Sequence, residues 1–201
     1  TQDILIKYFF RKKIIVGLNN IFSEDCAVIL APTHRSRWDG LVLTYAAGRR
    51  VTSEDCRFMV TRPEMKGIQG WFLRRLGCFS INQNAPSLSS LRYALRLINA
   101  KKQLVVFPEG KINKFNKKLP LKQGLFRLAR LAKSKGTNVM VVPIGIAYSQ
   151  INPKFGGNVA LCFEKPLYIR DFLDSSISRF NSILSERMNN AQNEALKIVD
   201  Q

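Results

Sequence analysis

The sequence predicts an α/β fold in which a mostly parallel central sheet carries helices on both of its faces. Short apolar runs alternate along the chain with segments whose apolar residues recur every three or four positions, which is typical of strands alternating with helices. The apolar runs are nearly continuous, as in strands that are buried on both faces. With 201 residues, of which 46% are hydrophobic and 23% charged, the chain is long enough to build one sizeable core.

Each element is placed by its apolar pattern and by the Pro, Gly or Ser residues at its ends. The expected strands are residues 26–31, 57–61, 78–81, 103–107, 138–146, 158–163 and 167–169. The expected helices are residues 41–47, 63–76, 88–98, 120–135 and 177–199, with a polar loop over residues 49–55. Gly48 and Gly136 are expected to end helices, Pro63 to open one, and Ser87 to cap one.

The helix expected over residues 63–76 has two kinds of side chain. Apolar residues recur at spacings of three and four, and they predict a side packed on the core: Met65, Ile68, Phe72 and Leu76. Cations occupy the remaining positions and are expected to face water: Lys66, Arg74 and Arg75.

One domain is expected, formed by residues 24–201 and preceded by an amphipathic, basic N-terminal segment, residues 1–23. Residues 3–18 mix aliphatic and aromatic side chains with a cationic cluster, which is the composition of a helix lying in a membrane interface. A helix packed on the core, with its basic residues in water, explains the same composition. No transmembrane helix is predicted, because no run approaches 18 consecutive apolar residues. No secretory signal is predicted either, because Lys7 and the cations at residues 11–13 interrupt the N-terminal apolar runs.

The charge balance indicates an anionic partner. Thirty-two Lys and Arg against 14 Asp and Glu give a net charge of +18 and a sequence pI of about 10.2. Nucleic acid, an anionic membrane and a phosphorylated thioester all fit this charge. The four cysteines are far apart and mostly within apolar runs, so we expect reduced core thiols in a reducing compartment. One histidine and no Cys-x-x-Cys pair argue against a protein metal site.

The single histidine, His34, follows the strand expected over residues 26–31, and Asp39 follows five positions later. On one continuous helix, five residues turn about 500°, and the two side chains would diverge. Across a turn from strand to helix, however, the Asp39 carboxylate can reach back to the imidazole Nδ1. That contact would fix the tautomer and leave Nε2 as a general base. A helix-capping Asp39 beside a structural His34 is the alternative.

Three further stretches follow the His34-x4-Asp39 block along the chain: 77–82 (Gly-Cys-Phe-Ser-Ile-Asn), 107–110 (Phe-Pro-Glu-Gly) and 141–144 (Val-Val-Pro-Ile). The order and approximate spacing of these four blocks are those of a known protein family. With these four blocks the chain resembles the glycerolipid acyltransferase family, which includes the lysophosphatidic acid acyltransferases, over roughly residues 24–170. The resemblance implies a glycerolipid acyltransferase-like fold. It also implies acyl transfer from acyl-CoA or acyl-carrier protein, as substrates rather than cofactors, to a lysolipid hydroxyl in phospholipid biosynthesis. His34 would match the family's general base and Asp39 the residue that orients it. No metal or covalent intermediate is required, and backbone N–H groups near the motif turn are expected to stabilise the oxyanion.

The expected substrate-binding residues surround this pair. Glu109 could hold an acceptor hydroxyl or position its loop, or could simply stabilise the turn beside Gly110. Lys111 and Lys114 begin a lysine-rich loop over residues 111–122 that suits a phosphate, although a membrane contact or a solvated charge run would give the same composition. Arg35 and Arg37 flank the base and could serve a donor or acceptor phosphate, or face the membrane.

Two positions depart from the pattern of lysophosphatidic acid acyltransferases. Where many of those enzymes have an arginine in the second and third blocks, this chain has Gln83 and Ile112, neither of which can replace a guanidinium. Lys111, Lys114, Arg74 or Arg75 could supply the missing charge, or the acceptor could be another lysolipid or lipid alcohol.

We therefore expect a cytoplasmic acyltransferase peripherally associated with an anionic membrane. A non-enzymatic lipid-binding protein, or a basic nucleic-acid-binding protein, is the alternative of another class. Nucleic acid is disfavoured because no zinc-finger spacing, RNA-recognition aromatic motif or basic zipper occurs. A serine lipid hydrolase is disfavoured because no Gly-x-Ser-x-Gly elbow is present.

Overall fold

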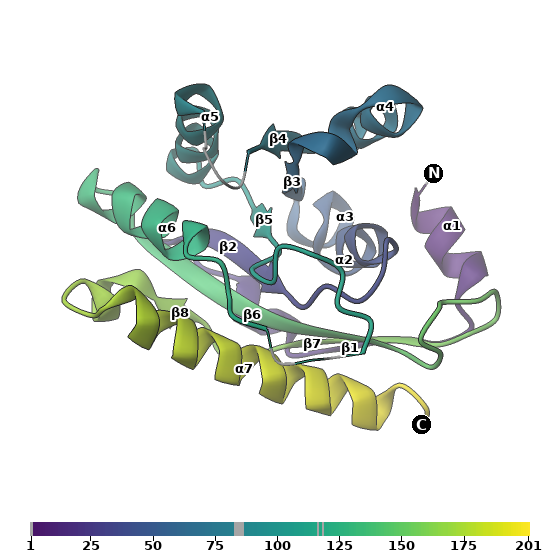
Figure 1. Cartoon of the computed structure of the whole chain (residues 1–201). Helices are drawn as coiled ribbons and strands as arrows, with labels where there is room; N and C mark the ends of the chain where they lie inside the picture. Colours follow the sequence, from purple (N-terminus) through teal and green to yellow (C-terminus); the bar gives the residue numbers. More distant parts are fainter. Residues whose placement is uncertain (1, 83–86, 116, 118) are drawn as a thin grey trace.

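The computed structural model describes residues 2–82, 87–115, 117 and 119–201, and its centre is an eight-stranded sheet (Figure 1). The strands are β1 (Lys13–Val16), β2 (Ala27–Pro32), β3 (Arg57–Thr61), β4 (Phe79–Ile81), β5 (Leu104–Val106), β6 (Val139–Tyr148), β7 (Val159–Phe163) and β8 (Leu167–Tyr168). Their order is β1-β7-β6-β2-β5-β3-β4, and β8 pairs with β6. Strands β4, β3, β5, β2 and β6 form one parallel set, whereas β7 and β8 run antiparallel to β6. The predicted mostly parallel sheet is confirmed.

Helices cover both faces of this sheet (Figure 1). They are α1 (Gln2–Phe9), α2 (Asp39–Ala47), α3 (Arg49–Thr52), α4 (Gly67–Arg75), α5 (Leu88–Asn99), α6 (Gly124–Ser134) and α7 (Ile177–Ile198), with short 3-10 turns η1 (Leu18–Ile21), η2 (Arg62–Met65) and η3 (Ile169–Phe172). Side chains of α1, α2 and α4 pack with one side of the sheet, including Leu30, and those of α5, α6 and α7 pack with the other, including Ile29. Adjacent residues of β2 thus enter opposite halves of the core, as the strand period of two requires.

Helix α7 is fixed closely to the central strand β6. Gly145 lies where a Cβ would be 2.2 Å from the backbone carbonyl carbon of Ala191, so only glycine fits at this crossing. Beside it, the buried Thr33 hydroxyl donates to Gln192 Oε1 (2.6 Å) and accepts from the N–H of Ile146 (3.0 Å). These contacts tie α7 to the strand ends that carry the candidate site.

Most predicted elements are found with shifted ends, but several local predictions are wrong; the helix expected over residues 63–76, for example, is divided at the extended Lys66 into η2 and α4. Residues 13–16 form an edge strand that pairs with β7, rather than part of a helix over residues 3–18. Residues 49–52 form a short helix instead of loop. Helix α6 begins at Gly124, not at residue 120, and the N–H of Lys122 instead donates to the carbonyl of Pro108 (2.8 Å), outside any helix.

The N-terminal helix α1 has one buried side and one exposed side. Ile6 and Phe10 are fully buried, and Phe10 packs against the rings of Trp38 and Tyr148. Ile4, Leu5 and Tyr8 face outward. Helix α1 therefore packs on the core, which was the alternative to a helix lying in a membrane interface. Its outer side nevertheless exposes apolar side chains.

The apolar side predicted for residues 63–76 is wrong in its central part. Ile68 is 87% exposed and Phe72 48%, whereas Gly70 and Leu73 face the protein. The reason is a close approach of backbones, because a Cβ on Gly70 would lie 2.0 Å from the Met65 carbonyl oxygen. The glycine therefore occupies the inner side of α4 and turns the larger apolar side chains outward.

The remaining sequence predictions concern thiols and membrane spans. All four cysteines are buried and free, as expected, and burial raises the pKa of Cys56 to about 12. Within the described ranges, no helix combines the length and hydropathy that a membrane crossing requires.

Candidate active site

The candidate site lies where the parallel strands end. His34 follows β2, Glu109 follows β5, and Tyr148 is the last residue of β6. Since β2, β5 and β6 are parallel neighbours, their carboxyl ends lie side by side at the same end of the sheet. Residues far apart in the sequence are thereby brought together, as expected for an open α/β sheet.

His34 and Asp39 form the predicted contact. Pro32 ends β2, residues 33–38 form the turn, and Asp39 begins α2. His34 Nδ1 lies 2.8 Å from Asp39 Oδ2, and the carboxylate is completely buried while the imidazole is 21% exposed. An ionised Asp39 accepts the proton carried on Nδ1, so the basic nitrogen of the neutral ring is Nε2. The ring is also stacked on Phe107, with 4.1 Å between centroids, which fixes its plane.

The Asp39 carboxylate is itself held in place. Its Oδ2 also accepts the backbone N–H groups of Arg35 (2.6 Å) and Ser36 (2.9 Å). Its Oδ1 accepts the Tyr148 hydroxyl at 2.7 Å. Removal of the phenol from water, together with the negative charge of Asp39, raises the pKa of Tyr148 well above its ordinary value, so Tyr148 stays a donor. Sequence reasoning missed Tyr148; the only available signal was its place near the end of an apolar strand.

Glu109 is the centre of a second buried cluster. Its carboxylate accepts the backbone N–H of His34 (3.0 Å), Arg35 Nη1 (2.9 and 3.0 Å) and Asn113 Nδ2 (2.7 Å). Arg35 Nη1 also donates to the carbonyl of Asn113 (3.1 Å), whose N–H in turn donates to the His34 carbonyl (2.6 Å). The cluster joins the histidine turn to the loop after β5. The structure therefore supports the interpretation that Glu109 positions its loop, one of the three roles expected for it.

Arg35, one of the expected substrate-binding residues, forms a buried ion pair with Glu109. Arg35 and Glu109 have side-chain exposures of only 8% and 5%. Asn113, which the sequence reasoning did not single out, links both loops by also donating to the Lys117 carbonyl and accepting the Lys117 N–H. An Asn that bonds the backbone four residues later is a loop-closing residue, but composition alone does not reveal it.

The backbone donors of the histidine turn are already engaged. The N–H of His34 serves Glu109, and those of Arg35 and Ser36 serve Asp39. The expectation that this turn supplies donors for an oxyanion therefore fails for these three groups.

The two ends of the lysine loop line an open cavity of about 240 Å³ next to the Glu109 cluster. Its lining consists of Glu109, Gly110, Lys111, Leu119, Pro120 and Lys122. Gly110 has a φ of 70°, a left-handed conformation that glycine adopts without strain and that turns the chain into the loop. Three predicted residues, Glu109, Gly110 and Lys111, thus line one cavity together with Lys122, which the sequence did not single out.

The other predicted cations are directed elsewhere. Lys114 donates to Asn152 Oδ1 (2.9 Å) in the loop after β6, and Arg37 donates to Gln69 Oε1 (3.3 Å) on α4. Ile112 is half-buried, and Gln83 lies outside the described residues. No group of three or more His, Cys, Asp or Glu residues that could hold a metal ion is found in the described part of the chain.

A buried carboxylate that orients a partly exposed imidazole, at the carboxyl edge of an α/β sheet, provides a positioned general base. The sequence of residues 13–147 matches the family model described as Acyltransferase, and the chain belongs to that family. It is 26% identical over 129 residues to a 1-acyl-sn-glycerol-3-phosphate acyltransferase of Streptococcus pneumoniae, a match that covers 63% of this chain and 44% of the relative. The chain thus spans less than half the length of that curated relative.

A solved structure shares the fold. The 1-acyl-sn-glycerophosphate acyltransferase PlsC of Thermotoga maritima superposes with a TM-score of 0.65 at 21% identity, covering 93% of this chain and 73% of that one. Family and fold thus agree with the resemblance that the four sequence blocks carry.

Proposed function

We propose that this chain transfers a fatty acyl group from a thioester donor to the free hydroxyl of a lysophospholipid, with 1-acyl-sn-glycerol-3-phosphate as the first candidate acceptor. The observation that carries the proposal is the 2.8 Å contact between the partly exposed His34 and the buried Asp39. The name of the Streptococcus relative supports the choice of acceptor.

The chemistry uses His34 as a proton carrier. Nε2 removes the proton of the acceptor hydroxyl as its oxygen attacks the thioester carbonyl carbon, giving a tetrahedral intermediate and an imidazolium. The intermediate collapses, the carbon–sulfur bond breaks, and the leaving thiolate takes the proton from Nε2. Asp39, which contacts Nδ1 throughout, stabilises the imidazolium and keeps the ring oriented.

The cavity beside Glu109 supports an anionic acceptor. Lys111 and Lys122 line it, and their ammonium groups would attract the acceptor phosphate as point charges in place of the arginine absent at Ile112. A lysolipid or lipid alcohol without a phosphate at this position is the second candidate acceptor, favoured by Ile112 itself. Acyl-CoA and acyl-carrier protein both remain candidate donors, since both are thioesters with an anionic carrier.

We further propose that the protein works in the cytoplasm, peripherally bound to an anionic membrane. The net charge of +18 supports this association, and lysolipid acceptors reside in membranes.

The test is transfer of a radiolabelled acyl group from each donor to a panel of lysolipids, with and without the acceptor phosphate. Wild type, His34→Ala and Arg179→Ala, an exposed residue of α7, are compared on the same vesicles. Loss of at least a hundredfold in His34→Ala alone supports the proposal. Equal transfer by His34→Ala, or no transfer by wild type to any acceptor together with tight salt-sensitive binding of arbitrary nucleic acid, would overturn it.

A further inference from the structure

One side of helix α4 carries large apolar side chains that are exposed to solvent. Ile68 is 87% exposed, Trp71 55% and Phe72 48%. At 100° per residue these three side chains lie within one sector of the helix, opposite Gly70 and Leu73, which face the core. Such a cluster of large exposed apolar groups on a short helix needs a partner or a non-aqueous environment.

Cations surround this apolar side. Four cations are exposed here: Arg62 on η2, Lys66 between η2 and α4, and Arg74 and Arg75 on α4. The one acid in this stretch, Glu64, accepts a hydrogen bond from Gln69. Arg75 also lies over the Trp71 ring, with its Cζ 4.3 Å from the ring centroid. Apolar and aromatic side chains bordered by arginine and lysine are the combination that anionic lipid surfaces attract.

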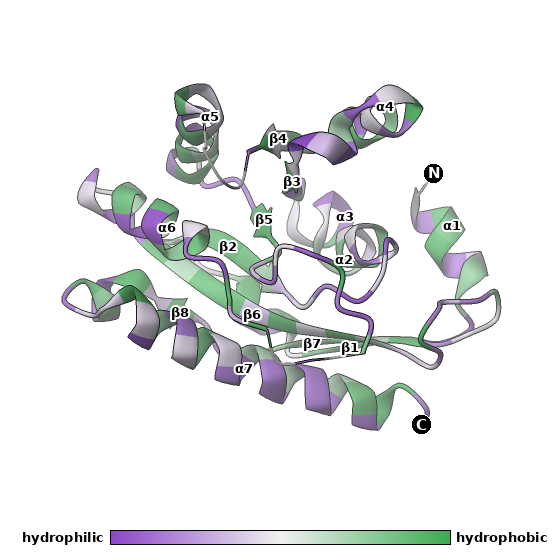
Figure 2. Cartoon of the chain, viewed as in Figure 1, coloured by the Kyte–Doolittle hydropathy of each residue, from purple (hydrophilic) through white to green (hydrophobic). Residues whose placement is uncertain are grey.

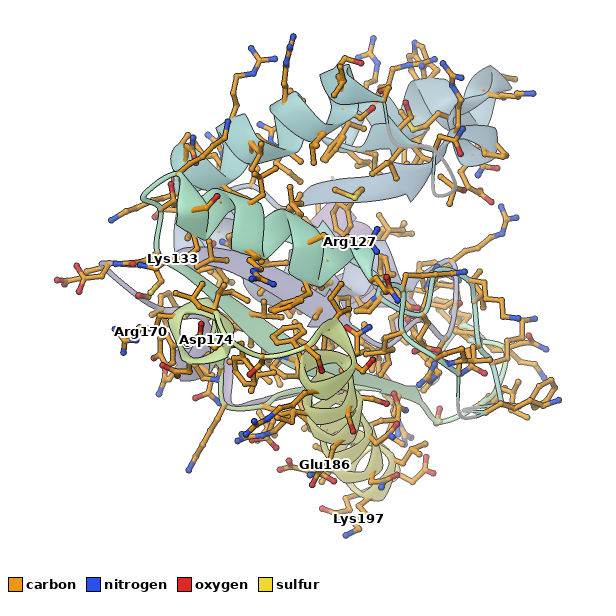
Figure 3. All side chains as sticks on the ribbon, turned by 60° about the vertical axis from the view of Figure 1, so that its left-hand side comes forward. Arg127, Lys133, Arg170, Asp174, Glu186 and Lys197 are labelled. Atoms are coloured by element: carbon orange, nitrogen blue, oxygen red, sulfur yellow. The ribbon has the colours of Figure 1, made fainter. Side chains whose placement is uncertain are left out.

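The opposite layer of the protein has a different surface. Figure 3 shows Asp174 and Glu186 on the same side of the molecule as Arg170 and Lys197, so side chains of both charge signs are mixed along η3, α7 and the turn between them. The hydropathy colouring likewise gives α7 a largely polar ribbon, whereas α4 has both hydrophobic and hydrophilic parts (Figure 2), with Arg74 and Arg75 in its last turn. Positive charge and exposed apolar area thus coincide on α4.

Helix α4 is also connected to the candidate active site. It follows β3, whose carboxyl end lies on the same sheet edge as His34, and Arg37 of the histidine turn donates to Gln69 of α4 (3.3 Å). Any surface bound by α4 would therefore lie beside the turn that carries His34.

We propose that α4 and η2, residues 62–75, form a docking site for an anionic lipid bilayer, with Ile68, Trp71 and Phe72 entering the headgroup boundary and the surrounding cations meeting lipid phosphates. This assigns membrane contact to a segment other than the N-terminal one. Nucleic acid does not explain the most exposed member of the site, because the aliphatic side chain of Ile68 neither stacks on bases nor binds phosphates. The inference extends the proposed function, but it is tested by vesicle binding and not by enzyme activity. A negative result for lipid docking can therefore be distinguished from a negative result for acyl transfer.

The first experiment measures partition onto vesicles of phosphatidylcholine with and without phosphatidylglycerol. On the anionic vesicles, Arg74→Gln with Arg75→Gln should reduce the partition coefficient roughly thirtyfold at low salt, and replacement of Ile68, Trp71 and Phe72 by Ser more than tenfold. The matched controls on α7 are Arg179→Gln with Lys197→Gln for charge and Leu196→Ser for exposed apolar area, and each should stay within a factor of about two. Equal losses in the controls, or wild-type partition by the α4 variants, would overturn the proposal.

The second experiment needs no disruptive substitution. The chain has two tryptophans, Trp38 and Trp71, and brominated phosphatidylglycerol quenches only an indole that reaches the acyl boundary. We expect quenching and a blue shift in wild type, and the loss of both in Trp71→Phe, which keeps Trp38 within its aromatic contacts. Quenching that persists in Trp71→Phe, or that is absent in bound wild type, would refute the docking of α4.

Discussion

Replacement of Asp39 by Asn is the sharpest test of how the base works. The amide oxygen can take the place of Oδ2 and still accept the proton of His34 Nδ1 and the N–H groups of Arg35 and Ser36, while the amide nitrogen faces the Tyr148 oxygen. The geometry is thus largely preserved and only the negative charge is lost. A charge about 4 Å from the imidazolium, at an effective dielectric constant of about 20, is worth about 4 kcal/mol. We therefore expect the acyl-transfer step to slow roughly a thousandfold.

The assay is single-turnover acyl transfer, in which product release cannot mask the chemical step. Circular dichroism and the midpoint of urea unfolding confirm that the variant is folded. His34→Ala, measured in parallel, sets the rate that remains without a base. A rate for Asp39→Asn within tenfold of wild type, with the fold intact, would show that the Asp39 charge does not act in the transition state.

Other predictions concern stability. Glu109→Ala should lower the free energy of unfolding by about 3–5 kcal/mol in urea titrations, because it removes the buried carboxylate that Arg35 pairs with; a loss under 1 kcal/mol would contradict this. Gly145→Ala should cost about 1–3 kcal/mol or prevent folding, since its Cβ would overlap the α7 backbone, whereas Gly124→Ala, with open space around it, should be neutral or slightly stabilising. Native Tyr148 keeps its phenol proton above about pH 10, where the unfolded chain has lost it, so native stability falls as pH rises further. Tyr148→Phe should make that fall shallower by about 1.4 kcal/mol per pH unit, and an unchanged slope would refute the assignment.

The part of the site that is local in sequence was predictable. His34 and Asp39 are five residues apart, and the Pro32 end of an apolar strand followed by a helix was enough to place them together. Tyr148 was not predictable, because its bond to Asp39 depends on the register of β6 beside β2, which no local pattern encodes.

The errors in the fold have similar causes. Residues 13–16 were assigned to a helix because composition does not distinguish a four-residue edge strand from a helical turn, and their partner lies near the other end of the chain. For α4, periodicity identified apolar positions but not the direction they face. That direction was decided by the approach of Gly70 to the Met65 carbonyl, a tertiary contact.

The pairing of β1 with β7 has a consequence for the order in which the molecule assembles. Strands β2, β3, β4 and β5 all lie between residues 27 and 106 and can pair before the later strands have been synthesised. Lys13–Val16 have no place in the sheet until Val159–Cys162 have emerged and paired with β6. Strand β1 therefore precedes the other strands in the sequence but is among the last to be incorporated, and its pairing with β7 is the most non-local of the sheet. Because such loops are slow to close, docking of β1 is expected to limit the late phase of folding.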